Sequence, residues 1–250
     1  MPIDYVKRQP APEPGPGISL AKVQAAAPGL VDLYKQAAVS LQKHGLGGRR
    51  VAVYLVLDRS GSMSPYYADG SAQHLAEQVL ALSAHLDDDG VVPVVFFSTT
   101  VDGIAEISLD SYHGRINALH ESYGHMGRTA YHLAMEAVIE HYQASGATEP
   151  ALVVFQTDGG PINKGAAEQV LCRAAGLPIF WQFVGFGSDE FRFLHRLDDL
   201  PVPGRRVVDN AGFFPAGKDP RSVPVGVLYD RLMSEFPQWL AEAGRAGIVR

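Results

Sequence analysis

Three short segments hold closely spaced carboxylate and hydroxyl side chains. Asp58-Arg59-Ser60-Gly61-Ser62-Met63 places a carboxylate and two hydroxyls in one tight loop, and Thr157-Asp158-Gly159-Gly160 adds a second carboxylate. Gly127-Arg128-Thr129 adds a hydroxyl directly before a predicted helix. Carboxylate and hydroxyl oxygens are hard ligands that suit Mg²⁺ or Mn²⁺. If the segments meet, the candidate metal ligands are Asp58, Ser60, Ser62, Thr129 and Asp158.

The charge of this candidate set balances a divalent ion. Asp58 and Asp158 contribute about two negative charges when ionised, and the three hydroxyls add oxygens without charge. The ion would therefore stay electrophilic toward one more anionic ligand. A carboxylate from another protein at that position would make the site a device for protein binding.

The sequence around these segments predicts the strands and helices of one α/β domain. Residues 51–57 are almost wholly apolar and β-branched, which is typical of a central strand covered on both faces of a parallel sheet. Residues 151–156 and 179–184 predict two more strands. Helices are predicted over residues 75–86, 130–142, 166–175 and 191–197. Ligands bind at the carboxyl ends of the strands in such sheets, so the loops after Leu57, Gln156 and Val184 are the expected site.

The remaining segments complete a doubly wound, mostly parallel sheet. Residues 92–97 and 104–109 lie so close in sequence that they predict a hairpin with an antiparallel strand at the sheet edge. Val207-Val208 predicts a weak last strand. Residues 225–243 predict a helix that Pro237 kinks or splits.

The amino-terminal part predicts a separate organisation. Residues 1–17 hold five prolines and two glycines and predict a flexible tail. Leu30, Leu33, Tyr34 and Leu41 recur at helical spacing, so a helix is expected to lie on the domain. The expected division is a tail over residues 1–17, a helical extension packed on the domain over 18–46, and the domain itself over 47–250.

Together, the candidate motifs resemble a known family. D-x-S-x-S after a hydrophobic strand, a downstream threonine and a T-D-G loop after a later strand are similar to the metal-ion-dependent adhesion site (MIDAS) of von Willebrand factor A (vWA) domains, over about residues 50–245. The resemblance implies a vWA/Rossmann-like fold. It also implies that Ser60, Ser62 and Thr129 are hydroxyl ligands of Mg²⁺, with Mn²⁺ or Ca²⁺ as alternatives, and that Asp58 and Asp158 bind directly or through water.

A narrower resemblance concerns residues 18–46 joined to this domain. They look similar to bacterial vWA proteins of tellurium-resistance and stress-response gene clusters (TerF-like). What the two resemblances imply is a non-enzymatic module whose protein partner offers an Asp or Glu to the metal.

Composition argues against several other classes of function. Lys and Arg number 21 against 27 Asp and Glu, a net charge of −6, which disfavours binding to nucleic acid. No apolar run approaches the roughly 20 residues of a transmembrane helix, and no signal peptide is evident, so a cytoplasmic protein without membrane insertion is expected. The single cysteine, Cys172, excludes an internal disulfide and is expected to be buried.

Each candidate ligand also has an ordinary structural interpretation. Ser60 and Ser62 could be loop and N-cap residues, Thr129 an N-cap and Asp158 a turn residue. Arg59 and Arg128 flank the site and either steer an acidic partner or are exposed loop residues. The run Asp87-Asp88-Asp89 is expected to be a solvated turn. Five histidines follow no metal-binding spacing: His113, His120, His125, His132 and His141.

Enzymatic alternatives fit less well. A phosphotransferase or phosphatase of the haloacid-dehalogenase type would use Asp58 as nucleophile, but it requires an acid two residues later, where this chain has Ser60. A serine hydrolase would need G-x-S-x-G, which is absent around Ser60 and Ser62. Gly185-Phe186-Gly187 lacks the third glycine of a dinucleotide-binding loop.

Overall fold

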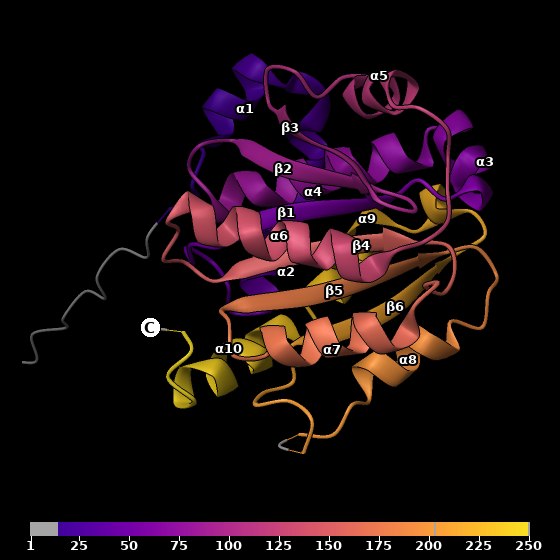
Figure 1. Ribbon diagram of the computed structural model, residues 1–250. Helices are drawn as coiled ribbons and strands as arrows, with labels where there is room; N and C mark the ends of the chain where they lie inside the picture. The colour runs from indigo at the N-terminus through magenta and orange to yellow at the C-terminus, as the bar shows by residue number, and fades with distance from the viewer. Residues whose placement is uncertain (1–14, 203, 250) are drawn as a thin grey trace, which may run out of the picture.

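One six-stranded sheet organises residues 15–202 and 204–249, which are the residues that the computed structural model describes. The strand order is β3-β2-β1-β4-β5-β6 (Figure 1). Only β2 and β3 pair antiparallel. The strands are β1 Ala52–Asp58, β2 Val91–Phe97, β3 Val101–Ser108, β4 Ala151–Thr157, β5 Ile179–Phe186 and β6 Ala211–Gly217. This arrangement confirms the predicted doubly wound α/β fold with an antiparallel edge strand.

The register of the central strands brings the two predicted carboxylate loops together. Nearly every residue of β1 and all of β4 and β5 are buried, as their apolar sequences predict. Leu57 of β1 pairs with Gln156 of β4 in parallel register. Asp58 and Thr157, the next residues of the two strands, therefore lie next to each other at the carboxyl-terminal ends of β1 and β4.

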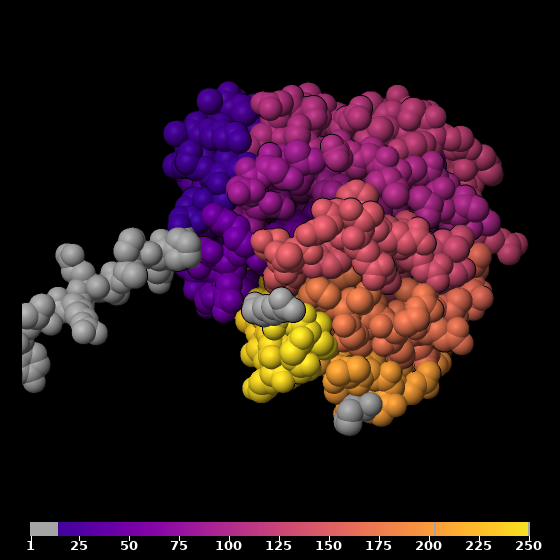
Figure 2. All heavy atoms as spheres, turned by 60° about the vertical axis from the view of Figure 1, so that its left-hand side comes forward, coloured from indigo at the N-terminus to yellow at the C-terminus, as the bar shows by residue number. Residues whose placement is uncertain are grey.

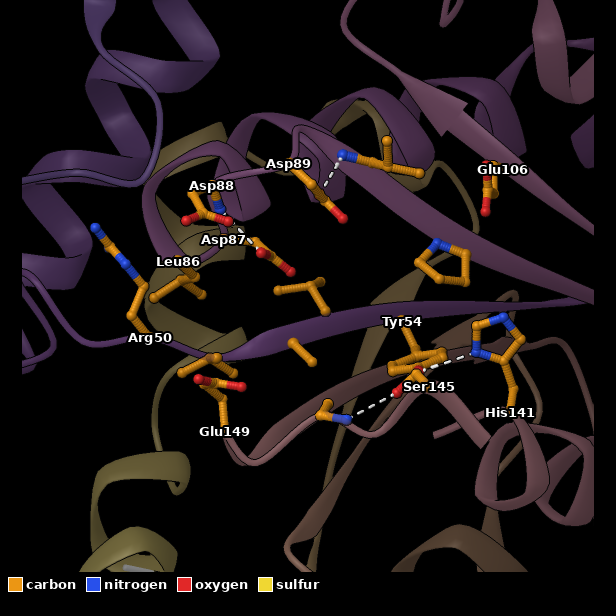
Figure 3. A pocket seen from close by; sticks show the side chains of 16 residues that line it. Arg50, Tyr54, Leu86, Asp87, Asp88, Asp89, Glu106, His141, Ser145 and Glu149 are labelled. Carbon is orange, nitrogen blue, oxygen red and sulfur yellow. Dashed lines mark hydrogen bonds between the residues drawn. The ribbon is translucent and has the colours of Figure 1, made fainter. Parts of the chain in front are cut away.

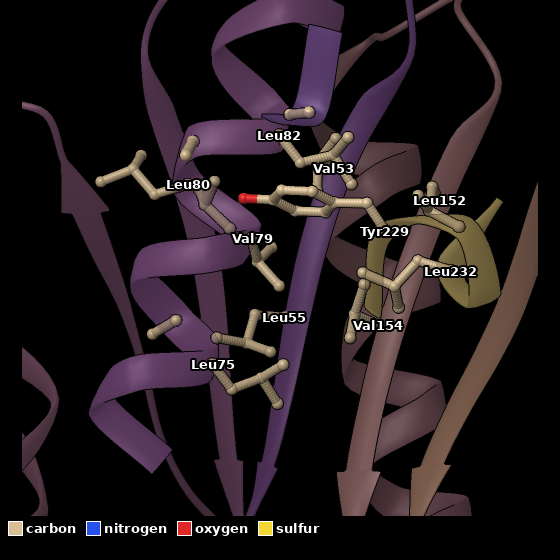
Figure 4. Packing of buried hydrophobic residues seen from close by; sticks show 14 of the residues in the cluster. Val53, Leu55, Leu75, Val79, Leu80, Leu82, Leu152, Val154, Tyr229 and Leu232 are labelled. Atoms are coloured by element: carbon tan, nitrogen blue, oxygen red, sulfur yellow. The ribbon is translucent and has the colours of Figure 1, made fainter. Parts of the chain in front are cut away.

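Helices cover both faces of the sheet. On one face, α4 (Ser71–Leu86), α9 (Val225–Leu232) and α10 (Phe236–Arg245) belong to the larger hydrophobic cluster. In this cluster Leu75 and Val79 lie beside Leu55, and Tyr229 lies beside Val53 (Figure 4). On the other face lie α6 (Tyr131–Ser145), α7 (Lys164–Ala174) and α8 (Arg192–Asp198) (Figure 1). The short elements are α3 Ser64–Ala68, α5 Arg115–Ser122, η2 Gly61–Met63 and η3 Pro220–Ser222.

The amino-terminal helices pack on the first of these faces. They are α1 Leu20–Ala26, η1 Pro28–Leu30 and α2 Val31–Lys43, and α2 contacts α4 and α9. Buried Tyr34 stacks on His85 with ring centroids 3.8 Å apart and donates a hydrogen bond to the Ile18 carbonyl. Figure 2 shows this indigo segment against the purple and magenta surface. The division into tail, extension and domain stays a prediction, and residues 1–14 of the expected tail lie outside the described residues.

Several local predictions are wrong. The last strand is β6, not Val207-Val208, and Val207 is 59% exposed. The sequence of β6, AGFFPAG, has weak strand propensity, but Pro215 is tolerated because β6 is an edge strand. Cys172 is partly exposed rather than buried. By contrast, the predicted split of the carboxyl-terminal helix is confirmed: it divides into α9 and α10, with Pro237 in the first turn of α10.

Helices α3 and α5 were not predicted, because each is too short to show a clear apolar period. Helix α1 lies within the helical extension predicted over residues 18–46. Among the described residues, no helix combines the length and the apolar character needed to cross a membrane.

Candidate metal site

Asp58 lies fully buried at the end of β1, with both carboxylate oxygens engaged. Oδ1 accepts a hydrogen bond from the backbone N–H of Ser60 at 2.6 Å. Oδ2 accepts one from Thr157 Oγ1, also at 2.6 Å. Burial raises the pKa of Asp58 to about 7, against the opposing effect of these hydrogen bonds. The carboxylate is thus held in one orientation beneath the loop.

The hydroxyls of Ser60 and Ser62 converge on Asp158. The two Oγ atoms lie 3.3 Å apart. Ser62 Oγ donates to Asp158 Oδ1 at 2.9 Å, and Ser60 Oγ lies 3.5 Å from the same oxygen. Burial and the nearby Asp189 raise the pKa of Asp158, whereas the serine hydroxyls lower it. Three of the five predicted ligands therefore meet through side-chain oxygens, next to buried Asp58, which accepts from the backbone of Ser60.

Thr129 reaches the site on a strap formed by residues 127–129. Gly127 forms a parallel bridge with Ser60, and its carbonyl accepts from the N–H of Gly61 at 3.0 Å. The Thr129 carbonyl accepts from the N–H of Ile162, which lies in the loop after β4. The strap therefore spans both carboxylate loops. Within the described part of the chain, the Thr129 hydroxyl makes no hydrogen bond to the other four candidates. The N-cap of α6 is Ala130, so Thr129 does not cap the helix.

Two residues that support the site were missed in the sequence. Thr157 belongs to the T-D-G loop but is not among the predicted ligands, yet its hydroxyl orients Asp58. The fully buried Tyr131 hydroxyl lies 3.2 Å from Thr157 Oγ1 and also contacts the Gly159 carbonyl. Thr157 stands in the T-D-G motif and could have been found there. Nothing in the sequence around Tyr131 marks it.

Both interpretations of Arg59 as a surface residue are wrong. Its side chain is 1% exposed and forms an ion pair with Asp102, so it cannot steer a partner toward the site. In the tight turn after β1, the side chain of Ser60 points toward Asp158, whereas the side chain of Arg59 points back into the fold. Arg128 is exposed, as expected.

The described residues contain no second candidate metal site. No group of three or more His, Cys, Asp or Glu in the described residues is arranged to hold a metal. The candidate site depends on hydroxyls and has only two carboxylates. Asp88 and Asp89 are exposed. With Asp87, Arg50 and His141, they line a cavity of about 400 Å³ (Figure 3). Ala52 and Val53 at the start of β1 also line it, at the opposite end of the strand from Asp58.

The sheet order and the loops at its carboxyl edge define a von Willebrand factor A type domain. The chain belongs to the vWA-TerF-like family, described as the vWA domain found in the C terminus of TerF, which it matches over residues 50–249. It is 34% identical over 229 residues to the uncharacterized protein YcbR of Bacillus subtilis (strain 168), covering 88% of this chain and 90% of that one.

Solved structures show the same fold at low sequence identity. A von Willebrand factor type A protein from Catenulispora acidiphila has a TM-score of 0.50 at 14% identity, covering 75% of this chain and 42% of that one. The pilus adhesin SpaC from Lactobacillus rhamnosus GG has a TM-score of 0.51 at 13% identity, covering 76% and 30%. This chain therefore spans less than half of each of these two proteins.

Proposed function

We propose that this protein is a metal-dependent protein-binding module and not an enzyme. Asp58, Ser60, Ser62, Thr129 and Asp158 would hold Mg²⁺, with Mn²⁺ or Ca²⁺ as alternatives, in a MIDAS-type site. The ion would capture the carboxylate of an Asp or Glu side chain from a protein partner. The observation that carries this proposal is the convergence of the Ser60 and Ser62 hydroxyls on Asp158 next to a buried Asp58.

The donor set fits such an ion. Two serine hydroxyls and one carboxylate oxygen lie within 3.5 Å of one another, which is the hard-oxygen chemistry that Mg²⁺ prefers. Both oxygens of Asp58 already accept hydrogen bonds inside the fold, so this residue would act on the ion through water. With two carboxylates present, the ion would keep affinity for a further anionic ligand.

The same burial argues against the phosphotransferase alternative. A nucleophilic aspartate must reach a phosphorus atom, but Asp58 is 0% exposed and both its oxygens are engaged. The residue two positions later is Ser60, which cannot serve as the acid that protonates a leaving group. The geometry of Asp58 therefore supports a binding role.

Membership of the TerF-like family supports a setting in a bacterial tellurium-resistance or stress-response system. We place the protein in the cytoplasm, without membrane insertion and without a nucleic-acid partner. The net charge of −6 supports the last point.

Calorimetric titration of the purified protein with Mg²⁺ tests the site. Ser62→Ala should weaken binding, while Ser64→Ala, which changes an exposed serine just outside D-x-S-x-S, should leave it unchanged. Turnover of a phosphomonoester that requires both Mg²⁺ and Asp58 would contradict the proposal, as would equal Mg²⁺ affinity in all three proteins.

A further inference from the structure

Arg59 points away from the candidate ligands and into the fold. Its side chain is 1% exposed, and Nη1 lies 2.7 Å from Oδ2 of Asp102 in β3. Asp102 in turn accepts from Ser98 Oγ at 2.8 Å. A buried arginine needs such partners, because an unpaired charge inside a protein is strongly unfavourable. The turn that carries Ser60 and Ser62 is therefore tied to the hairpin of β2 and β3.

The rest of the guanidinium caps the end of α5. Nη2 donates to the carbonyls of His120 and Gly124 at 3.2 and 3.0 Å, and to that of Tyr123 at 3.4 Å. Nε donates to His120 Nδ1 at 3.1 Å. The last carbonyls of a helix lack partners within the helix, and a cation there also interacts favourably with the helix dipole. Arg59 thus fixes the point where the chain leaves α5.

A second contact joins α5 to the start of the loop that carries Ser60 and Ser62. The ring of His120 stacks on that of Tyr67, with centroids 3.9 Å apart. The Tyr67 hydroxyl donates to the Asp58 carbonyl at 3.0 Å. His120 is therefore linked to residues on both sides of the Asp58–Arg59 peptide.

The chain that leaves α5 leads directly to the strap with Thr129. Three residues after Gly124, Gly127 pairs with Ser60 and approaches Thr99 so closely that a Cβ would lie 2.4 Å from Thr99 Oγ1. The far end is held by the N–H of Ala130, which donates to the Ser98 carbonyl at 2.8 Å. Both ends of the strap are thus connected to the Arg59–Asp102 pair, one through the carbonyls of α5 and the other through Ser98.

We infer that Arg59 is a positioning residue that sets the Thr129 hydroxyl against the D-x-S-x-S loop. It touches neither the ion nor the partner. It acts on metal affinity by fixing where the chain leaves α5, and so where the strap of residues 127–129 begins. This inference rests on the proposed function and assigns a specific task to the second residue of D-x-S-x-S.

A double-mutant cycle on Mg²⁺ affinity tests the inference. The variant Arg59→Met with Asp102→Asn removes the carbonyl anchor without leaving Asp102 as an unpaired buried charge. We expect about a tenfold loss of Mg²⁺ affinity, as for other residues that orient metal ligands. In a Thr129→Ala background the same pair of changes should cost less than twofold, because the strap no longer carries a ligand. Asp102→Asn alone is the matched control, because its amide oxygen can still accept from Arg59 and the bonds of Arg59 to the carbonyls remain. It should lose clearly less affinity than the double variant.

The outcomes separate positioning from general support of the fold. Equal losses of affinity with and without Thr129 would overturn the inference, even if the melting temperature of the metal-free protein falls in both backgrounds. If Asp58→Ala abolishes Mg²⁺ binding while the Arg59 variant binds normally, the inference fails and the proposed function stands. If the unsubstituted protein binds no Mg²⁺, both fail. Should the double variant not fold, Arg59→Lys serves in the same cycle, because a lysine keeps the charge but cannot reach all the carbonyls.

Discussion

Thr157 on β4 donates a hydrogen bond of 2.6 Å to Asp58 Oδ2 on the neighbouring strand β1. The bond joins the carboxyl-terminal ends of the two strands, where both carboxylate loops begin. It fixes the carboxylate of Asp58, and Thr157 is itself contacted by the hydroxyl of Tyr131. The site therefore rests on a chain of buried polar groups that reaches from Asp58 to α6.

Replacing Thr157 by valine should destabilise the metal-free protein. The change keeps the shape of the side chain but leaves a buried carboxylate oxygen without its donor, which costs about 1–3 kcal/mol. Denaturant unfolding in the presence of a chelator measures this loss. Thr157→Ser keeps the hydroxyl and is the control. If valine and serine at this position are equally stable, the hydrogen bond has no net value.

The carboxylates should matter more for Mg²⁺ than the single hydroxyls. Asp58→Ala removes one of the two charges that would balance the ion, whereas Ser60→Ala removes a neutral donor. We expect calorimetry to show a greater loss of affinity for Asp58→Ala, and both proteins to fold. Unchanged affinity in Asp58→Ala would contradict the assignment of the site.

Capture of a protein partner should require the ion and Thr129. A partner carboxylate would complete the ligands of the ion, so a pull-down should succeed with Mg²⁺ and fail with a chelator. Thr129→Ala should weaken capture, while Ser64→Ala should not. Capture that persists in chelator would place the interface elsewhere on the protein.

The amino-terminal helices should be required for stability, and the residues before them should not. Deleting residues 1–17 removes few apolar groups, so the melting temperature should change little. Deleting residues 1–46 exposes the surface beneath Leu30, Tyr34 and Leu41, each buried in the larger cluster. Each such side chain contributes roughly 1.5–3 kcal/mol, so this protein should melt early or aggregate. Equal melting of both deletions would show that α2 adds nothing to the core.

Asp198 should make the protein less stable as pH rises. Burial, followed by the nearby Glu235 and Asp209, raises the pKa of Asp198 to about 7 from 3.8. Between about pH 4 and pH 7 the unfolded chain is then ionised at this position while the folded one stays protonated, so stability falls with rising pH. Asp198→Asn should gain stability relative to the unsubstituted protein between pH 5 and pH 8 in urea unfolding. A difference that does not change with pH would contradict the shifted pKa.

The local sequence predicted most of the strands because a strand that is buried on both faces consists almost wholly of apolar residues. Residues 51–57 and 151–156 are apolar because both faces of β1 and β4 are covered. The strand β6 could not be predicted, since AGFFPAG has little strand propensity and pairs only because β5 offers an open edge. Short helices such as α5 depend on tertiary contacts, among them the cap from Arg59.

Residue types and local patterns were enough to indicate which side chains could bind a hard cation and that two of their loops would follow parallel strands. Parallel strands end on the same side of a sheet, so both loops were expected at the carboxyl-terminal ends of the strands. The loops meet because β1 and β4 are neighbours in parallel register, which is a property of the folded sheet. Three other features appear only in the folded chain: Arg59 is buried against Asp102, Thr157 and Tyr131 support Asp58, and a strap held by Ser98 carries Thr129. These relationships join residues from 26 to 99 positions apart. They depend on strand register and helix packing, which no local pattern of residue types encodes.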